Sequence, residues 1–581
     1  MPSPRFIFLE NVMKKFVICI VLCFLLAVET VGATVLDTKA PYFGDYLFVY
    51  NPTDSEVSFS PAVSASVKSM MLRNTVGNPT DSTEQLHWSP DYSDLSLKTD
   101  LIESSVLKKR DSAVLYAASS SDVGDTLTYL VTNPQTGVMY YQDFIYQASG
   151  QYCNILVEPD ANGDPKISVA DAQKLVTEFD TNIQPFMVTN FGDYYTEMWL
   201  YLEKYLLTSK NQKMDILLYD IQDGYNGTTN RSYVGGYTDL TDFISTDLGG
   251  NGNEQGILHI DIYPLMGTSG EPDVEKAYST IVHEFQHQIS YSDSLFDYFI
   301  GKTSFYINDA WWNEAFSMAA EHLYTGKPLT YRLNSYNQVN NSTPLRNGLV
   351  LGYLDYSENN NNVASNYSTS YLFGQYLRCQ TKHLTGGGNQ IYRTILEQVG
   401  TDYTAILAGL AAIGYEYTPS NFEELYRNFR MATILKNSTG PYGFAGEDTF
   451  SGLSDNAYTG TADLTLKPGA AVVLAQPENF TPSNTNLSYV SFSNRGDFTY
   501  DLNAVSDTMV NLTHGDLPES GVTFLAAGYD IHGKLLGTEE LILVENQENY
   551  PCSFPEESVT KKFFLFTGDG SLRPLSYVEI R

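Results

Sequence analysis

The sequence STIVHEFQHQI at residues 279–289 carries the strongest structural signal in the chain. Residues four positions apart lie on one face of an α-helix, so His283 and His287 can both turn an imidazole nitrogen toward a single metal ion. Glu284 lies beside them, close enough to take a proton from a water bound to that metal. Apolar residues supply a side on which this helix can pack: Ala277, Ile281, Val282, Phe285 and Ile289.

A third metal ligand is expected from a second segment, AWWNEAFSMAAE at residues 310–321. A catalytic zinc usually has three protein ligands and an open position for water. The spacing that would place a third histidine just after the pentad is absent, since Ser290 and Asp293 stand there. Glu314 follows His287 by 27 residues (314 − 287), which leaves room for a loop and a returning helix. The alternatives are a solvated helix carboxylate at Glu314 and a polar helix face with two incidental histidines.

The two segments together resemble the gluzincins, in which an Asn-Glu pair on a second helix supplies the third zinc ligand. The wider context is similar to the hyicolysin-type bacterial metallopeptidases, over roughly residues 152–436. This resemblance implies a zinc endopeptidase with a thermolysin-like, two-part catalytic domain and a cleft between a strand-bearing half and a helical half. One Zn²⁺ per chain is expected. The further motifs that carry it are ILLYDIQDGY at 216–225, VGGY at 234–237, ILHIDIY at 257–263 and SYLFGQYL at 370–377.

The sequence departs from thermolysin at one position near the site. Thermolysin has an aspartate four residues after its glutamate ligand, where this chain has Met318. Glu321, seven residues after Glu314, returns to the same helical face. Metal-bound histidines normally donate their second N–H to such a partner. Glu321 is therefore predicted to orient a ligand histidine, with a surface carboxylate as the competing interpretation.

The expected chemistry is peptide hydrolysis, with Glu284 as general base and an additional donor for the developing oxyanion. Tyr371, in the motif at 370–377, is the predicted donor. Tyr367 lies one turn earlier and is the rival, and either tyrosine can instead be a packed aromatic residue. The predicted strand 257–262 is expected to pair with an extended substrate, and His259 on it is interpreted as structural or cleft-lining rather than as a ligand.

A calcium site is a weaker hypothesis for residues 160–171. Asp160, Asn162 and Asp164 have the spacing of a calcium loop, but Pro165 replaces the glycine of the sharp turn and Asp171 replaces the usual glutamate. A polar turn that leads into a helix capped by Ser168 is the simpler interpretation.

The N-terminus has the features of a secretory signal. Lys14 and Lys15 precede an apolar run at 16–28, and a small residue, Ala33, stands at the expected cleavage point. The run is short for a membrane span, and no second stretch could cross a membrane. A lipid anchor at Cys23 is the less favoured alternative. We therefore expect a protein that is secreted, or held at the cell surface or in a periplasm.

Composition narrows the possible partners. The chain has 34 Lys and Arg against 68 Asp and Glu, which argues against nucleic acid or an anionic membrane as the main partner. Proteins or peptides are the expected substrates. Cys153, Cys379 and Cys552 remain after removal of a signal, and free thiols are favoured over a disulfide framework.

A chain of 581 residues is expected to form several domains. The predicted fold class is multidomain α+β, with a thermolysin-like zincin domain between two β-sandwich-like domains. The predicted segments are a signal peptide at 1–33, an N-terminal β domain and possible pro-segment at 34–150, a metallopeptidase domain at 151–440, and a C-terminal β domain at 441–581.

Two other functions remain open at this point. A non-catalytic surface or adhesion protein that retains a peptidase fold would suit the flanking β domains, but the predicted ligands and general base are all present. A zinc aminopeptidase is the second alternative, and no glycine-rich exopeptidase signature accompanies the strand at 257–262.

Overall fold

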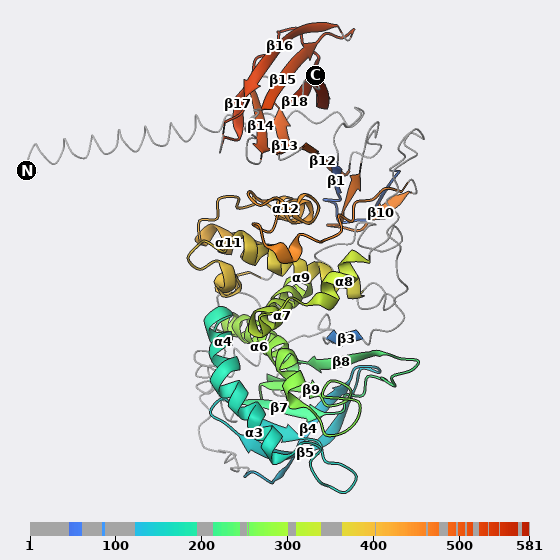
Figure 1. Ribbon diagram of the computed structural model, residues 1–581, viewed down its shortest axis with the longest axis vertical. Helices are drawn as coiled ribbons and strands as arrows, with labels where there is room; N and C mark the ends of the chain where they lie inside the picture. The colour runs from blue at the N-terminus through green and yellow to red at the C-terminus, as the bar shows by residue number, and fades with distance from the viewer. Residues whose placement is uncertain are drawn as a thin grey trace, which may run out of the picture. The chain divides into compact units, whose positions relative to one another are not determined.

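The chain forms two compact units in the computed structural model (Figure 1). The larger unit comprises Met70–Leu345 and Leu349–Asn456, and the smaller comprises Met1–Ser69, Arg346–Gly348 and Ala457–Arg581. The structure describes residues 46–60, 84–87, 122–193, 213–243, 253, 255–299, 309–338, 363–400, 402–460, 463–475, 486–495, 498–505, 508–514, 522–532, 534–544, 547–567 and 572–579. The predicted signal peptide and the possible anchor Cys23 lie outside these residues.

The larger unit is built on a seven-stranded mixed sheet of order β3-β8-β9-β7-β6-β5-β4. Strands β6, β7 and β9 are parallel, and every residue in them is buried. This burial explains their nearly continuous apolar sequences, because parallel strands are covered on both faces. The strands are β3 Glu84–His87, β4 Thr126–Asn133, β5 Val138–Ser149, β6 Cys153–Val157, β7 Met214–Tyr219, β8 Ser232–Tyr237 and β9 Ile257–Asp261.

Strand β9 lies inside this sheet rather than at its edge. It pairs with β7 on one side, in parallel, and with β8 on the other, antiparallel. Since β7 pairs along 257–261 and β8 pairs at His259 and Ile260, the structure does not support the hypothesis that a substrate pairs along 257–262. Strand β8 and then β3 lie toward the sheet's edge instead.

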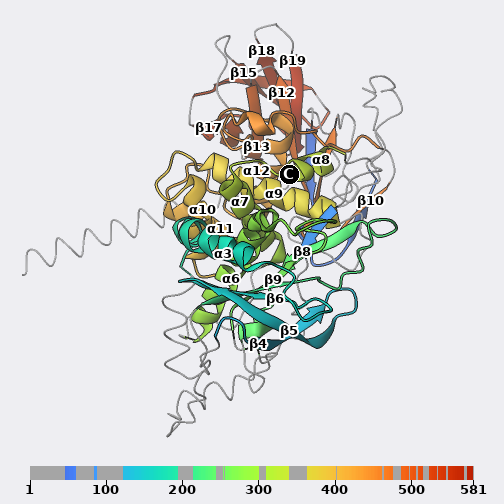
Figure 2. The ribbon, with the colours of Figure 1, turned by 60° about the horizontal axis from the view of Figure 1, so that its bottom comes forward.

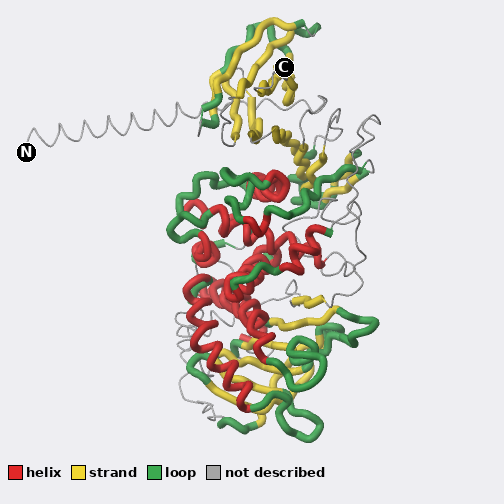
Figure 3. Tube along the Cα trace, viewed as in Figure 1, coloured by secondary structure: helices red, strands yellow, loops and turns green. Residues whose placement is uncertain are grey.

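Helices fill the rest of the larger unit, with strands and most helices separated along its length (Figure 3). Asn421 is the N-cap of α12, where its side chain accepts the Glu424 N–H, and Gly326 ends α7 in the left-handed conformation. The helices are α3 Val169–Glu178, α4 Gln184–Asn190, α6 Tyr278–Phe299, α7 Ala310–Thr325, α8 Thr330–Asn337, α9 Val363–Gln380, α10 Ile391–Leu396, α11 Tyr403–Ala412 and α12 Phe422–Leu435.

The smaller unit is formed by β-strands in its described part. A six-stranded sheet has the order β11-β1-β12-β13-β14-β17, a four-stranded sheet has the order β16-β15-β18-β19, and β2 pairs with β10. One hydrophobic cluster joins the two larger sheets through residues such as Val510, Leu512, Phe524 and Phe563. The strands are β1 Tyr46–Tyr50, β2 Val57–Phe59, β10 Leu464–Leu466, β11 Ala471–Ala475, β12 Ser488–Arg495, β13 Phe498–Val505, β14 Met509–His514, β15 Val522–Tyr529, β16 Leu535–Ile542, β17 Asn549–Pro551, β18 Thr560–Thr567 and β19 Leu572–Glu579.

The structure divides the chain differently from the predicted boundaries. Strand β1 lies between β11 and β12, so residues 46–50 belong to the same sheet as the C-terminal strands. Strands β4 and β5 continue the sheet of the larger unit. The segment 34–150 is thus shared between both units, because strand pairing depends on contacts that are distant in sequence.

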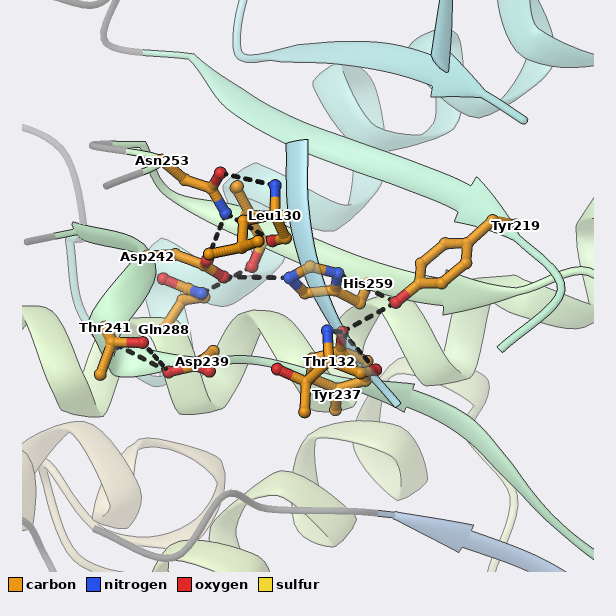
Figure 4. Close-up of polar contacts among 11 residues, drawn as sticks. Leu130, Thr132, Tyr219, Tyr237, Asp239, Thr241, Asp242, Asn253, His259 and Gln288 are labelled. Atoms are coloured by element: carbon orange, nitrogen blue, oxygen red, sulfur yellow. Dashed lines mark hydrogen bonds and ion pairs between the residues drawn. The ribbon is translucent and has the colours of Figure 1, made fainter. Parts of the chain in front are cut away.

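A buried polar network ties β9 to its neighbours (Figure 4). The Nε2 atom of His259 lies 3.0 Å from Oδ2 of Asp242, and its Nδ1 lies 3.2 Å from the Tyr219 hydroxyl. Its ring stacks on Tyr237 of β8 at 4.1 Å. On the α6 side, the Gln288 amide donates to the Ile257 carbonyl at 2.7 Å. The structural interpretation of His259 is confirmed, and the network fixes β8 and α6 relative to β9.

Replacing His259 by phenylalanine should destabilise the larger unit. The ring stacking on Tyr237 is kept, but buried Asp242 loses its imidazole partner, at a cost of about 2–4 kcal/mol. Scanning calorimetry should show a lower melting midpoint for the larger unit, while the control His532→Phe, at an exposed turn of the smaller unit, leaves it in place. An unchanged midpoint in His259→Phe would contradict this role.

Candidate metal centre

Helices α6 and α7 bring the three predicted ligands together in the larger unit. His283 and His287 lie one turn apart on α6, and Glu314 lies on α7, all three buried. The two Nε2 atoms are 3.2 Å apart. Oε2 of Glu314 lies 3.3 Å from Nε2 of His283, and its Oε1 lies 3.6 Å from Nε2 of His287.

These distances fit a tetrahedral zinc ion. Nitrogen and oxygen ligands lie about 2.0–2.1 Å from zinc, so two ligands of a regular tetrahedron are roughly 3.3 Å apart. The separation of the two histidine nitrogens lies close to that value, and each of these nitrogens has one Glu314 oxygen at a similar distance, Oε2 for His283 and Oε1 for His287. The ligand types are those of a catalytic zinc site. The three protein ligands would leave one tetrahedral position open for water.

The charges of the cluster also favour a cation. Burial alone would lower the pKa of His283, but its hydrogen bonds to Glu314 and Glu321 outweigh burial and raise it to about 10. Burial would raise the pKa of Glu314, but the two histidines and Arg332 lower it overall. The carboxylates therefore stabilise positive charge at this point, which a divalent ion can supply. His287 differs, because burial lowers its pKa to about 4 and keeps it neutral, as a metal ligand must be.

Glu284 lies on the side of helix α6 that faces strand β8. It is buried, and burial raises its pKa to about 8. A Cβ atom added to Gly236 of β8 would lie 3.1 Å from Cγ of Glu284 and 2.9 Å from Cγ2 of Thr280. A larger side chain at residue 236 would thus collide with the carboxylate's own stem, so this glycine makes the room that Glu284 occupies.

The comparisons with known proteins agree with this geometry. No family model matches the chain. Over 340 residues the chain is 30% identical to the neutral metalloprotease ShpI of Staphylococcus hyicus, and the match covers 58% of this chain and 69% of that protein. The chain belongs to this metalloprotease family.

The predicted partner of the first histidine in the metalloprotease is confirmed. Oε1 of Glu321 lies 2.8 Å from Nδ1 of His283, on the ring edge opposite the ligand atom. Glu321 is buried, which excludes the surface-carboxylate interpretation. Glu314 and Glu321 lie seven residues apart on α7, so one face of this helix carries a candidate ligand and the hydrogen-bond partner of His283, a second candidate ligand.

The contact of the second histidine was not predicted. The Ser317 hydroxyl lies 3.2 Å from Nδ1 of His287 and donates to the side-chain amide oxygen Oε1 of Gln286. The signal was present in the sequence, because Ser317 follows Glu314 within one turn of α7.

The structure separates the two tyrosines that were considered as oxyanion donors. The Tyr371 hydroxyl accepts the Leu329 N–H at 3.1 Å and lies 2.8 Å from Nδ1 of His322. Burial lowers the pKa of His322 to about 4, so Nδ1 of its neutral ring can accept a hydrogen bond from the Tyr371 hydroxyl. The Tyr371 hydroxyl is therefore occupied by structural contacts. In contrast, the Tyr367 hydroxyl lies 3.4 Å from Oε1 of Glu314, next to the metal ligands.

The possible calcium loop forms a polar turn. Oδ1 of Asp160 accepts the backbone N–H groups of Asn162 and Asp164, at 2.8 and 2.9 Å. Asp171 pairs with Lys174, and the Ser168 side chain caps α3 as predicted. These contacts confirm the polar turn and the Ser168 cap, and the calcium hypothesis stays a prediction.

Two further predictions concern the whole chain. Cys153, Cys379 and Cys552 are free and buried, so the preference for free thiols is confirmed. Within the described residues, no helix of the metalloprotease has both the length and the apolar character needed to cross a membrane.

Replacing Glu321 by glutamine should weaken zinc binding by about 10–100-fold, because the His283 ring loses a charged acceptor that orients it. Competition with a chromophoric chelator would measure the zinc affinity directly. Glu397→Gln, at an exposed glutamate that pairs with Arg393, is the matched control and should bind zinc like the wild type. Equal affinity in both variants would contradict the orienting role.

Proposed function

We propose that this metalloprotease is an exported zinc endopeptidase of the gluzincin type, which hydrolyses peptide bonds in protein or peptide substrates. The separations of 3.2, 3.3 and 3.6 Å among the ligand atoms of His283, His287 and Glu314 carry the proposal. The N-terminal signal pattern supports export, and the excess of acidic residues argues against a nucleic-acid partner.

One bound Zn²⁺ would lower the pKa of a water molecule and polarise the scissile carbonyl. Glu284 is the proposed general base. It follows His283 directly in the helix, so its carboxylate is held beside the three ligands, with Gly236 on the strand side. In this role it accepts a proton from the attacking water and passes it to the leaving amine.

Tyr367 is the proposed donor to the oxyanion, in place of Tyr371. Its hydroxyl lies 3.4 Å from the ligand oxygen of Glu314, and its ring is stacked by the Arg332 guanidinium at 4.6 Å. A phenol held in this way can donate to negative charge that develops next to the metal ligands. Arg332 is buried and its charge also acts on Glu314, so it positions both groups.

Replacing Glu284 by glutamine should lower kcat on casein or a fluorogenic peptide by at least about 10²–10⁴-fold, because the general base is lost. Elemental analysis should still find about one zinc per chain, since the three ligands are intact. Glu275→Gln, at an exposed carboxylate just before α6, is the control. A zinc-loaded wild type that cleaves no peptide would favour the non-catalytic interpretation, and cleavage only of free N-terminal residues would favour an aminopeptidase.

Replacing Tyr367 by phenylalanine should lower kcat by about 10²–10³-fold with little change in KM, as expected for a donor used in the transition state. Tyr371→Phe should retain most of kcat and lose thermal stability instead, because its hydroxyl contacts Leu329 and His322. The two substituted tyrosines lie one turn apart on the same helix, and steady-state kinetics of the two variants compares them. A large loss of kcat in Tyr371→Phe but not in Tyr367→Phe would show that Tyr371 is the oxyanion donor.

A further inference from the structure

The open side of strand β8 is covered by a short strand from far earlier in the chain. Strand β3 pairs with β8 in parallel, and the register places Glu84 opposite Ser232, Gln85 opposite Tyr233 and Leu86 opposite Val234. In the described part of the sheet β3 is the terminal strand. Figures 1 and 2 both show it beside β8, on the side away from β9.

This pairing runs directly past the candidate active site. His87 is the register partner of Gly236, the residue whose missing side chain makes room for Glu284. On its other side β8 pairs with β9 at Gly236 and Tyr237. Glu284 therefore lies against the face of β8 at Gly236, and at this residue β9 pairs with one edge of the strand and β3 with the other.

Such an edge is a binding surface for an extended peptide. A strand edge presents a row of main-chain N–H and C=O groups, and an added strand binds to them largely independently of sequence. A substrate that lies extended beside Glu284 needs these groups of β8. One edge can pair with one strand at a time, so β3 and a substrate exclude each other.

We propose that residues Glu84–His87 act as an intramolecular competitor, which occupies the peptide-binding edge of β8 and must be displaced by substrate. This inference rests on the proposed peptidase function. In this proposal two segments compete for the same edge of β8: an extended segment of the substrate protein, and the chain's own strand β3. Binding of β3 would therefore limit the binding of substrate.

The strand is tethered on both sides, which favours displacement over release. On its N-terminal side the chain leads to β1, which is held between β11 and β12 of the smaller unit. On its C-terminal side it leads to β4, the far edge strand of the same seven-stranded sheet. A single cut in the chain would therefore leave Glu84–His87 attached to one unit. A tethered segment competes at an effective concentration on the order of mM, comparable with the upper range of typical KM values.

Proline substitutions in β3 of the full-length protein provide the first test. Gln85→Pro combined with Leu86→Pro removes two main-chain donors and is incompatible with a paired strand. For a fluorogenic peptide of at least eight residues we expect KM to fall about 10-fold with kcat unchanged. The control Asn549→Pro affects a similarly short edge strand, β17 of the smaller unit, and should leave KM at the wild-type value. Equal KM values in the β3 variant and the wild type would overturn the proposal.

A disulfide that holds β3 on β8 tests the opposite change, in which β3 cannot leave. It also tests the proposal if the proline variant fails to fold. Ser232 and Glu84 are register partners, and neighbouring strands lie within the Cα separation that a disulfide can bridge. The double variant Glu84→Cys, Ser232→Cys should lose peptide cleavage when oxidised and regain it on reduction, while the buried native cysteines stay unreactive. Full activity in the oxidised, crosslinked form would overturn the proposal.

Peptide binding separates this inference from the proposed function. In the Glu284→Gln background, fluorescence anisotropy with the same labelled peptide should show about 10-fold tighter binding when β3 carries the two prolines. If the peptidase proposal fails, wild type and β3 variants alike cleave no peptide. If only this inference fails, the wild type cleaves peptides and the β3 substitutions change neither KM nor the dissociation constant.

Discussion

The close approach of two histidines on α6 and one glutamate on α7 is the constraint on which the larger unit depends. All three side chains are buried within 4.8 Å of one another, and burial of charged groups is costly unless an opposite charge is present. The pKa of His283 shows the result, since Glu314 and Glu321 raise it to about 10 against the effect of burial. A divalent cation at this point would meet the same electrostatic requirement. The cluster that would perform the chemistry is therefore also the one that fixes how α6 packs against α7.

The sheet positions this helix pair relative to the substrate-binding edge. The Gln288 amide joins α6 to β9, and His259 joins β9 to β8 through its stacking on Tyr237. Gly236 then allows Glu284 to approach β8 closely. These contacts hold Glu284, the proposed general base, against the face of β8 at Gly236, the residue whose register partner on β3 is His87. The buried network, the glycine and the edge strand thus act together, and a change in any of them should alter access to the same site.

Local sequence patterns predicted which side chains come together at the candidate metal centre, because its geometry is set within two helices. The four-residue spacing of His283 and His287 and the Asn-Glu pair containing Glu314 pointed to the clustered side chains, and the helical period pointed to Glu321. The role of Tyr371 and the domain boundaries were not predictable in the same way. Which of two tyrosines one turn apart faces the ligands depends on the packing of α9 against α7. The assignment of β1 and β3 to different units depends on strand pairing over hundreds of residues, which no local pattern records.

Anomalous diffraction at the zinc absorption edge, on crystals of the full-length protein grown with one equivalent of zinc, tests the central claim most directly. The account predicts a strong anomalous peak about 2.0–2.1 Å from Nε2 of His283, Nε2 of His287 and a carboxylate oxygen of Glu314. A peak at other residues, or no peak among these three side chains in zinc-loaded crystals, would contradict it.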